Sequence, residues 1–299
     1  MPSSTLKESF DIRGALRFEA GPGGLTRGVI STEAVKGEIY LHGAHITQWT
    51  PRDAKPGLFL SSKSVYQSGK AIRGGVPVIF PWFGPRGDGK PGPMHGFARI
   101  VEWRLERTAL LNDGAVEVTL ALEPNEQTRE LGYGAFLLRF TTVFGETLEM
   151  ELETRNISSD ALIFEQALHT YFVIGDIRQV SISGLEHAAY IDKPDDFRRK
   201  QQSLEPIRIS SETDRVYLNT AAACNIEDPA WQRRIVIEKS GSQTTVVWNP
   251  WIEKTKTLAD MAPDDWQRMI CVETANAADN AVRLAPGAAH VMRASIRLS

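Results

Sequence analysis

A segment rich in glycine and proline near residue 75 is the first part of the sequence that could hold a reactive group. Residues 71–85 read Ala-Ile-Arg-Gly-Gly-Val-Pro-Val-Ile-Phe-Pro-Trp-Phe-Gly-Pro, and Arg73 is their one charged residue. Glycine allows unusual backbone angles and proline restricts the chain, so the segment predicts a rigid loop rather than a regular central strand. Such a loop could hold Arg73 at the wall of a ligand pocket. The alternative is a structural loop with a solvated arginine.

A second stretch places an imidazole, an aromatic ring and a guanidinium close together in Met94-His95-Gly96-Phe97-Ala98-Arg99. If this stretch is extended, His95, Phe97 and Arg99 share one face. Histidine titrates near neutrality, and arginine can bind an anionic oxygen through two hydrogen bonds. The alternative is a capping or buried histidine beside a surface arginine.

Two further residues could transfer protons. His169 lies in the apolar and aromatic run Ala167–Phe172, which is typical of a buried strand, and Glu273 closes the apolar run that starts at Met269. Burial lowers the pKa of a histidine, which could then exchange a proton near pH 7, although most histidines in such a run are satisfied core residues. Glutamate is seldom buried without a partner, so Glu273 faces either solvent or a polar site.

No metal and no cofactor is expected. His42-Gly43-Ala44-His45 has no carboxylate or thiol nearby, whereas a catalytic zinc site takes three protein ligands. The sequence also lacks a Gly-x-Ser-x-Gly elbow, a phosphate loop with Gly-Lys-Ser/Thr, and a Gly-x-Gly-x-x-Gly that follows a predicted strand. Nucleotide chemistry is therefore not expected.

The elements that position these residues follow a strand pattern. Val116, Val118, Leu120 and Leu122 alternate with less apolar residues, and the same period of two marks 235–238, 244–248 and 292–298. Residues 136–144 and 148–152 flank Gly145-Glu146 and predict a hairpin. Helices are expected only near 123–131 and 263–268. The sequence therefore predicts an all-β protein.

The fold that we expect is one large antiparallel β-sandwich with few short helices. No repeat and no Pro/Ser-rich linker divides the chain, and strand patterns lie on both sides of its midpoint. We expect residues 21–299 to form a single catalytic domain, with residues 1–20 as an N-terminal extension that packs on it or precedes it.

Composition excludes several classes of partner. The chain has 299 residues with 34 basic and 37 acidic side chains, which is too balanced for nucleic-acid binding or a membrane-surface role. No apolar run approaches a membrane span, and residues 1–8 do not resemble a signal peptide. Cys224 and Cys271 lack the spacing of a zinc or disulfide framework. We expect a cytoplasmic monomer.

Five short motifs in this order carry a family resemblance. They are Ala71–Pro77, His95–Arg99, Leu168–Phe172, Trp248–Trp251 and Cys271–Glu273. Together they resemble the glucose-6-phosphate 1-epimerases, or hexose-6-phosphate mutarotases, a branch of the aldose 1-epimerase (galactose mutarotase-like) superfamily. The resemblance runs from about residue 21 to residue 298. It implies a large antiparallel β-sandwich that interconverts the α and β anomers of a hexose 6-phosphate, such as glucose 6-phosphate.

The resemblance also implies roles for single residues. His169 would be the general acid and Glu273 the general base, with Arg73 and Arg99 near the phosphate. Asp214, in the segment 211–217, matches a substrate-binding aspartate of the family, and we expect His95 to assist as a hydrogen-bond donor to the sugar. The family often carries Gln immediately before the His-Gly-Phe-Ala-Arg motif, whereas this chain has Met94.

Anomer exchange requires the chemistry that these residues offer. A base removes the proton of the C1 hydroxyl while an acid protonates the ring oxygen, and the ring opens, rotates about C1–C2 and closes again. Two alternatives remain open. An aldose 1-epimerase of free sugars would have no use for both Arg73 and Arg99, and a non-catalytic carbohydrate-binding domain would not need both His169 and Glu273.

Overall fold

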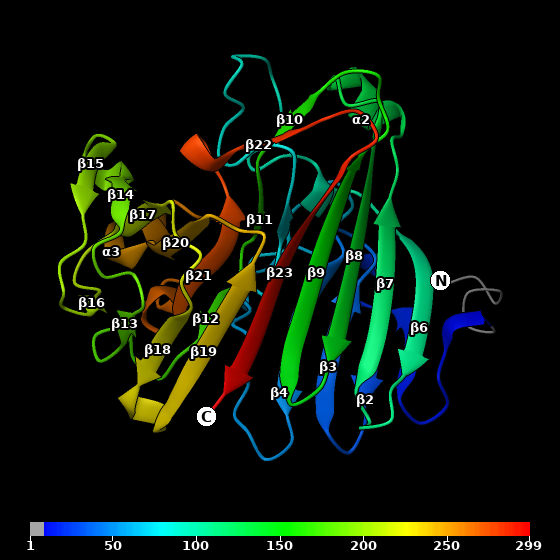
Figure 1. Cartoon of the computed structure of the whole chain (residues 1–299). Helices are drawn as coiled ribbons and strands as arrows, with labels where there is room; N and C mark the ends of the chain where they lie inside the picture. Colours follow the sequence, from blue (N-terminus) through cyan, green and yellow to red (C-terminus); the bar gives the residue numbers. More distant parts are fainter. Residues whose placement is uncertain (1–8) are drawn as a thin grey trace.

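A sheet of nine antiparallel strands forms the larger layer of the fold. The computed structural model describes residues 9–299, and Figure 1 shows this sheet in front. Its order is β16-β13-β18-β19-β23-β9-β8-β7-β6. The bounds are Ile207–Arg208 (β16), Ser181–Ser183 (β13), Cys224–Asp228 (β18), Arg233–Ser240 (β19), Ala289–Leu298 (β23), Thr147–Asn156 (β9), Phe136–Phe144 (β8), Val116–Leu122 (β7) and Arg104–Leu110 (β6).

A sheet of eight strands carries the candidate site. Its path is β15-β14-β17-β20-β21-β11-β5, and β12 pairs with β21 off this path. The bounds are Arg198–Gln201 (β15), Ala189–Asp192 (β14), Thr213–Leu218 (β17), Thr244–Asn249 (β20), Met269–Asn276 (β21), Gln166–Leu168 (β11), Val78–Ile79 (β5) and Tyr171–Val173 (β12).

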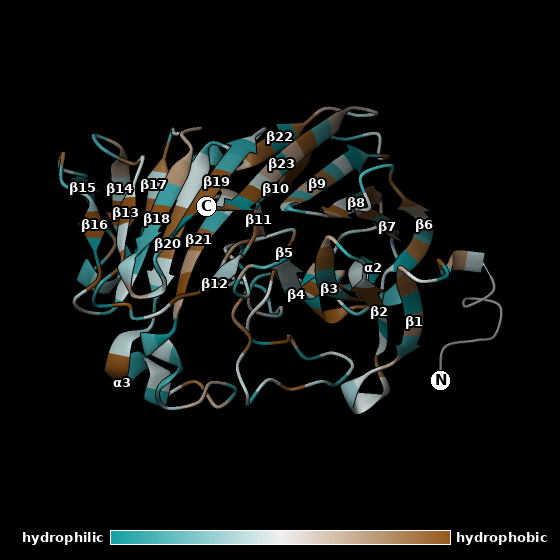
Figure 2. Cartoon of the chain, turned by 90° about the horizontal axis from the view of Figure 1, so that it is seen from below, coloured by the Kyte–Doolittle hydropathy of each residue, from teal (hydrophilic) through white to brown (hydrophobic). Residues whose placement is uncertain are grey.

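A third sheet lies behind one end of the nine-stranded sheet (Figures 1 and 2). It consists of β1 (Leu16–Ala20), β2 (Thr26–Ser31), β3 (Val35–Tyr40) and β4 (His45–Pro51). Strand β1 pairs with β2, so the expected extension 1–20 contributes a strand, while its residues 1–8 lie outside the described part of the chain. A separate pair joins β10 (Leu162–Phe164) to β22 (Val282–Leu284).

Period-two patterning builds the core between these layers. Phe136, Leu138 and Phe140 of β8 are fully buried, whereas Arg139 between them faces outward. In β23, Met292, Ala294 and Ile296 are buried. Because a strand sends alternate side chains to opposite faces, each strand fills the core with one face and meets solvent with the other. The predicted all-β antiparallel sandwich is therefore confirmed.

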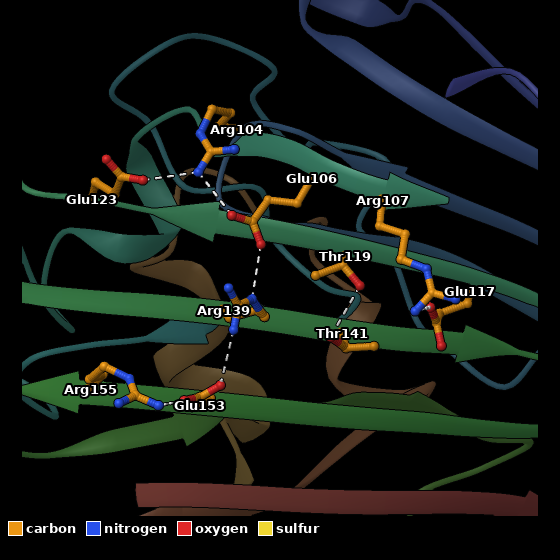
Figure 3. A network of polar contacts seen from close by, with 10 residues as sticks. All are labelled: Arg104, Glu106, Arg107, Glu117, Thr119, Glu123, Arg139, Thr141, Glu153 and Arg155. Carbon is orange, nitrogen blue, oxygen red and sulfur yellow. Dashed lines mark hydrogen bonds and ion pairs between the residues drawn. The ribbon is translucent and has the colours of Figure 1, made fainter. Parts of the chain in front are cut away.

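The outward face of the nine-stranded sheet carries a ladder of charges, which Figure 3 shows. Arg139 bridges Glu106 at 2.9 Å and Glu153 at 3.3 Å, while Arg104 and Arg155 extend the ladder at its two ends. Exposed ion pairs of this kind contribute at most about 1 kcal/mol each. This face is a solvated sheet surface.

The short elements agree in part with the sequence. Strands β8 and β9 form the predicted hairpin. Helix α2 (Glu126–Glu130) lies inside the predicted range and starts at Asn125, which caps the amide of Thr128. The helix predicted at 263–268 is only one 3-10 turn, Asp265–Gln267, and helix α3 (Trp251–Lys256) was not predicted. Within residues 9–299 no helix is long and apolar enough to cross a membrane.

Candidate active site

His169 lies at a break between two short strands that pair with the same neighbour. Leu168 of β11 pairs with Thr274 and Tyr171 of β12 pairs with Cys271, which places His169 opposite Glu273. The continuous strand predicted over 167–172 is therefore wrong at two residues. The reason is local: the amide of Thr170 turns back to the carbonyl of Leu168, and the amide of His169 donates to Pro77.

The imidazole and the carboxylate meet in a buried position. His169 Nδ1 lies 3.3 Å from Glu273 Oε1, and their side chains are 7% and 1% exposed. His169 Nδ1 and Glu273 Oε2 are buried without a hydrogen-bond partner among the described residues. Buried polar groups are normally satisfied, so unpartnered atoms at this position are consistent with groups kept for a ligand. Glu273 thus faces a polar site and not solvent, inside a strand that continues to Asn276.

The environment moves the pKa values of this pair in opposite directions. Burial raises the pKa of Glu273 well above 4.5, and Asp214 adds to this effect, whereas Lys193 opposes it. Burial and the charges of Arg99 and Arg73 hold the pKa of His169 well below 6.5. A carboxylate with a raised pKa accepts a proton from a hydroxyl more readily than a solvated one.

A single face of the eight-stranded sheet collects most of the site. Asp214 pairs with Trp248, Trp248 pairs with Cys271, and Cys271 pairs with Tyr171, across β17, β20, β21 and β12. Directly paired residues project to the same side of a sheet, as do residues two apart on one strand. Glu273 therefore shares the face of this row.

Arg73 is held by a loop whose backbone only glycine can adopt. Gly74 has a φ of +116°, and a Cβ there would lie 2.4 Å from the carbonyl oxygen of Phe59. On either side of Arg73, His42 Nε2 donates to the carbonyl of Lys70 and His45 Nε2 donates to that of Gly74, both at 2.7 Å. The two histidines therefore support the loop on both sides of Arg73.

The guanidinium of Arg73 contacts two side chains that the sequence did not single out as site residues. Its Nη1 donates to Tyr171 Oη at 3.0 Å, and its Nη2 lies 3.1 Å from Asp260 Oδ2. The Tyr171 ring stacks on the His169 imidazole with ring centres 4.8 Å apart. Arg73 is thus connected to His169 through one aromatic ring.

His95 and Arg99 reach the same cluster by a different route from the predicted one. The stretch is not extended, so the shared face considered for it does not form: His95 and Gly96 have φ values of +62° and +71°, and Arg99 lies in a 3-10 turn, Ala98–Ile100. The turn follows from packing, since Phe97 is fully buried and the backbone at Gly96 lies against Phe80. The His95 ring nevertheless lies 5.5 Å from that of His169.

Arg99 is a cation with few partners. Its Nη2 donates to the carbonyl of Met94 at 2.7 Å, and its Nε is buried without a partner among the described residues. Burial, together with nearby Arg73, lowers the pKa of Arg99 to about 10. It therefore stays charged at pH 7 beside a second guanidinium, an arrangement that a bound anion would stabilise.

Asp214 closes the cluster on its other side. It lies 3.0 Å from Lys193 Nζ, and this ammonium also sits over the Phe83 ring at 4.9 Å from its centre. The Phe83 ring in turn contacts His95, with ring centres 4.8 Å apart. The structure thus gathers all six candidate residues and adds Tyr171, Lys193 and Asp260. Only Tyr171 stood in a motif, while Lys193 and Asp260 lie in ordinary polar segments that give no signal.

Comparisons with known proteins identify the family of this chain. A model of the family described as aldose 1-epimerase matches residues 29–297. A protein of Escherichia coli K12 named "Putative glucose-6-phosphate 1-epimerase" is 36% identical over 251 residues, covering 84% of this chain and 83% of that one. One of the same name from Cenchrus ciliaris is 34% identical over 258 residues, covering 84% and 77%.

Solved structures extend the likeness to the whole fold. The crystal structure described as a "putative mutarotase" from Salmonella typhimurium matches with a TM-score of 0.90 at 31% identity, covering 97% of this chain and 95% of that one. The family model matches most of the chain. The relative from Escherichia coli is 36% identical to this chain over 83% of its own length. The chain therefore belongs to the aldose 1-epimerase family.

Proposed function

We propose that this protein interconverts the α and β anomers of a hexose 6-phosphate, with glucose 6-phosphate as the preferred substrate. One observation carries the proposal: the buried pair of His169 and Glu273 lies in one cluster with the two cations Arg73 and Arg99. A proton-transferring pair accounts for the opening of the sugar ring, and the cations account for an anionic substrate.

The distance between the pair suits the chemistry. The C1 hydroxyl and the ring oxygen are bonded to the same carbon, so an acid and a base that lie 3.3 Å apart can reach both of them. Glu273 takes the proton of the C1 hydroxyl while His169 gives a proton to the ring oxygen, and the ring opens to the aldehyde. After rotation about C1–C2, the two groups exchange roles and close the ring on the other face.

The phosphate has a role in this chemistry as well as in binding. Arg99 and Arg73 lower the pKa of His169 by their charge. A phosphate dianion bound between the two guanidinium groups offsets that charge, so it raises the pKa of His169 and favours its protonated, acidic form. Substrate binding thereby favours the state in which the histidine is protonated and Glu273 is a carboxylate.

Exchange spectroscopy tests the proposal. The exchange rate between α and β signals is measured by NMR for glucose 6-phosphate, galactose 6-phosphate and free glucose, with and without protein. We expect the protein to accelerate both phosphorylated sugars, glucose 6-phosphate more strongly, and free glucose much less. No acceleration of either phosphate would contradict the proposal.

A specific observation favours a second candidate, an aldose 1-epimerase that acts on free sugars. Arg73 is already engaged with Tyr171 and Asp260, and Arg99 with the carbonyl of Met94. These contacts would suffice if both arginines only supported the site. Faster exchange of free glucose than of its 6-phosphate would favour this candidate.

A further inference from the structure

A sulfur atom lies next to the proposed acid and base. Cys271 precedes Glu273 by two residues on β21, so both side chains project to the same face. Ligand atoms of His169, Cys271 and Glu273 all lie within 4.8 Å of one another, and all three residues are buried. Nitrogen, sulfur and carboxylate oxygen are the ligands that zinc prefers in proteins.

The spacing of the imidazole nitrogen and the nearer carboxylate oxygen matches a tetrahedral metal. Two bonds of about 2.0–2.1 Å that meet at the tetrahedral angle hold their ligand atoms about 3.3–3.4 Å apart. His169 Nδ1 and Glu273 Oε1 lie 3.3 Å apart without forming a hydrogen bond. A Zn–S bond of about 2.3 Å requires the sulfur to lie about 3.5–3.6 Å from each of them, so Cys271 has to move by little more than about 1 Å.

Charge also favours a divalent cation with a thiolate. Coordination replaces the proton of the Cys271 thiol, which is released to solvent, and Glu273 binds as a carboxylate. The two negative ligands neutralise one divalent cation, so the complex buries no net charge. Around the complex, Arg73 is paired with Asp260 and Lys193 with Asp214. Among the described residues, Arg99 is therefore the one cation of the cluster without an acidic partner.

We propose that His169, Cys271 and Glu273 bind one Zn²⁺ per chain and that this ion inhibits the protein in competition with its sugar. The inhibition rests on the proposed function, whereas the binding does not. The ion takes up the lone pairs of His169 and Glu273 that the proton transfers require. Three protein ligands leave the fourth position of the tetrahedron for water. Mg²⁺ prefers oxygen ligands in an octahedron and should not bind.

Cys271→Ser is the variant that tests the site, because it removes the soft ligand and leaves His169 and Glu273 in place. Zinc binding to the full-length protein is measured by competition with a chromophoric zinc indicator in a buffer without phosphate. Wild type should bind one equivalent, and Cys271→Ser should bind at least roughly tenfold more weakly. Co²⁺ should give a thiolate charge-transfer band that is absent in the variant.

Cys224→Ser is the matched control. Cys224 is the other buried cysteine, and it lies on β18 in the nine-stranded sheet, so its loss should leave zinc binding unchanged. Melting curves of each variant show whether it folds, and Cys271→Ala serves in place of the serine variant if that one does not. Equal zinc affinity in wild type and the Cys271 variants, or no stoichiometric binding, would overturn the proposal.

Activity separates this inference from the proposed function. With glucose 6-phosphate, Zn²⁺ should slow exchange by wild type, excess sugar should relieve the inhibition, and Cys271→Ser should keep its basal rate while losing most of its sensitivity to zinc. If zinc binds through Cys271 but no sugar is turned over, the proposed function fails and the binding site stands. Inhibition that more sugar does not relieve would refute the competition.

Discussion

The chemistry of single residues depends on where the fold places them. Glutamates such as Glu149 and Glu153 alternate along an outward strand face, whereas Glu273 is completely buried next to His169. The same side chain is a solvated charge at one place and a carboxylate with a raised pKa at another. Burial and proximity are therefore what make Glu273 a candidate base.

Replacement of Glu273 by glutamine tests that assignment. The amide has nearly the shape of the acid but cannot accept the proton, so we expect Glu273→Gln to slow the exchange of glucose 6-phosphate by about a hundredfold or more. The fold should be preserved, because a neutral amide is no harder to bury than the carboxylate. Exchange is followed by NMR, with circular dichroism and melting curves as the control for folding. A rate near that of wild type would remove Glu273 from the mechanism.

The two arginines should respond differently to replacement by alanine. A charge-assisted hydrogen bond contributes about 1.5–3 kcal/mol, so Arg99→Ala should raise KM for glucose 6-phosphate roughly tenfold or more and affect free glucose much less. Arg73→Ala should impair both sugars, because it also releases Tyr171, which stacks on His169, and leaves Asp260 unpaired.

The measurement is kcat/KM for both sugars in both variants, together with the melting temperature. If Arg99→Ala lowers kcat/KM equally for the two sugars, Arg99 does not bind the phosphate. A selective loss with the phosphate in Arg73→Ala would mean that Arg73 acts only through the phosphate and that its contact with Tyr171 matters little.

At the scale of elements, strands were predictable and their interruptions were not. Period-two alternation identifies β7, β8, β9 and β23, because each has one face in the core. The break at His169 could not be predicted, since the sequence around it is apolar without a Gly or Pro. The turn at His95 had a signal in Gly96, and the close approach of Gly96 to Phe80 is a tertiary contact that no local pattern contains.

The candidate site also has a part that could be predicted from the sequence and a part that could not. The candidate residues lie in five short segments that could be singled out in the sequence. Their partners Lys193 and Asp260 come from other segments, which meet them only in the folded chain. Likewise, nothing in the sequence around His42 and His45 indicated a function, whereas in the structure each donates a hydrogen bond to a backbone carbonyl of the Arg73 loop. Their function follows from the position of that loop and not from their own sequence.

His45 should make stability depend on pH. Burial lowers its pKa from 6.5 to about 3, and Nδ1, where the second proton would bind, has no partner among the described residues. Above pH 6.5 the histidine is neutral in both the folded and the unfolded chain. Below it only the unfolded chain takes up the proton, so the free energy of unfolding falls by about 1.4 kcal/mol per pH unit down to a pH near the folded pKa.

His45→Gln isolates this contribution. The glutamine amide can donate to the carbonyl of Gly74 in place of Nε2, but it does not titrate. In urea denaturation at pH 7, 6 and 5, the stability of wild type relative to the variant should therefore decrease with each step to lower pH. Other titrating groups are common to both proteins and cancel in the difference. If the free energies of unfolding of wild type and His45→Gln change equally with pH, His45 is not held neutral in the folded chain.

The whole molecule depends on chain segments that cross between the two large sheets. Strand β19 belongs to the nine-stranded sheet and the following β20 to the eight-stranded sheet, so residues 241–243 connect the layers instead of closing a hairpin. Asn276, at the end of β21, fixes this crossing: its Nδ2 donates to the carbonyl of Gly241 at 2.8 Å, and its Oδ1 accepts from the amide of Gln243 at 3.0 Å. The strand that carries Glu273 thus also joins the two layers.

Asn276→Ala should destabilise both sheets together. The substitution removes two partly buried hydrogen bonds, each of which contributes about 0.5–1.5 kcal/mol. By contrast, Arg139→Ala on the outward ladder should cost less than about 1 kcal/mol, because its side chain is 41% exposed and its ion pairs are solvated.

Urea denaturation followed by far-ultraviolet circular dichroism and by tryptophan fluorescence measures both variants. We expect one transition in each, the same midpoint by both probes, and a clearly lower midpoint only for Asn276→Ala. Two separate transitions in that variant would mean that the sheets can unfold independently, so that the crossing at Asn276 joins two units of separate stability and not one.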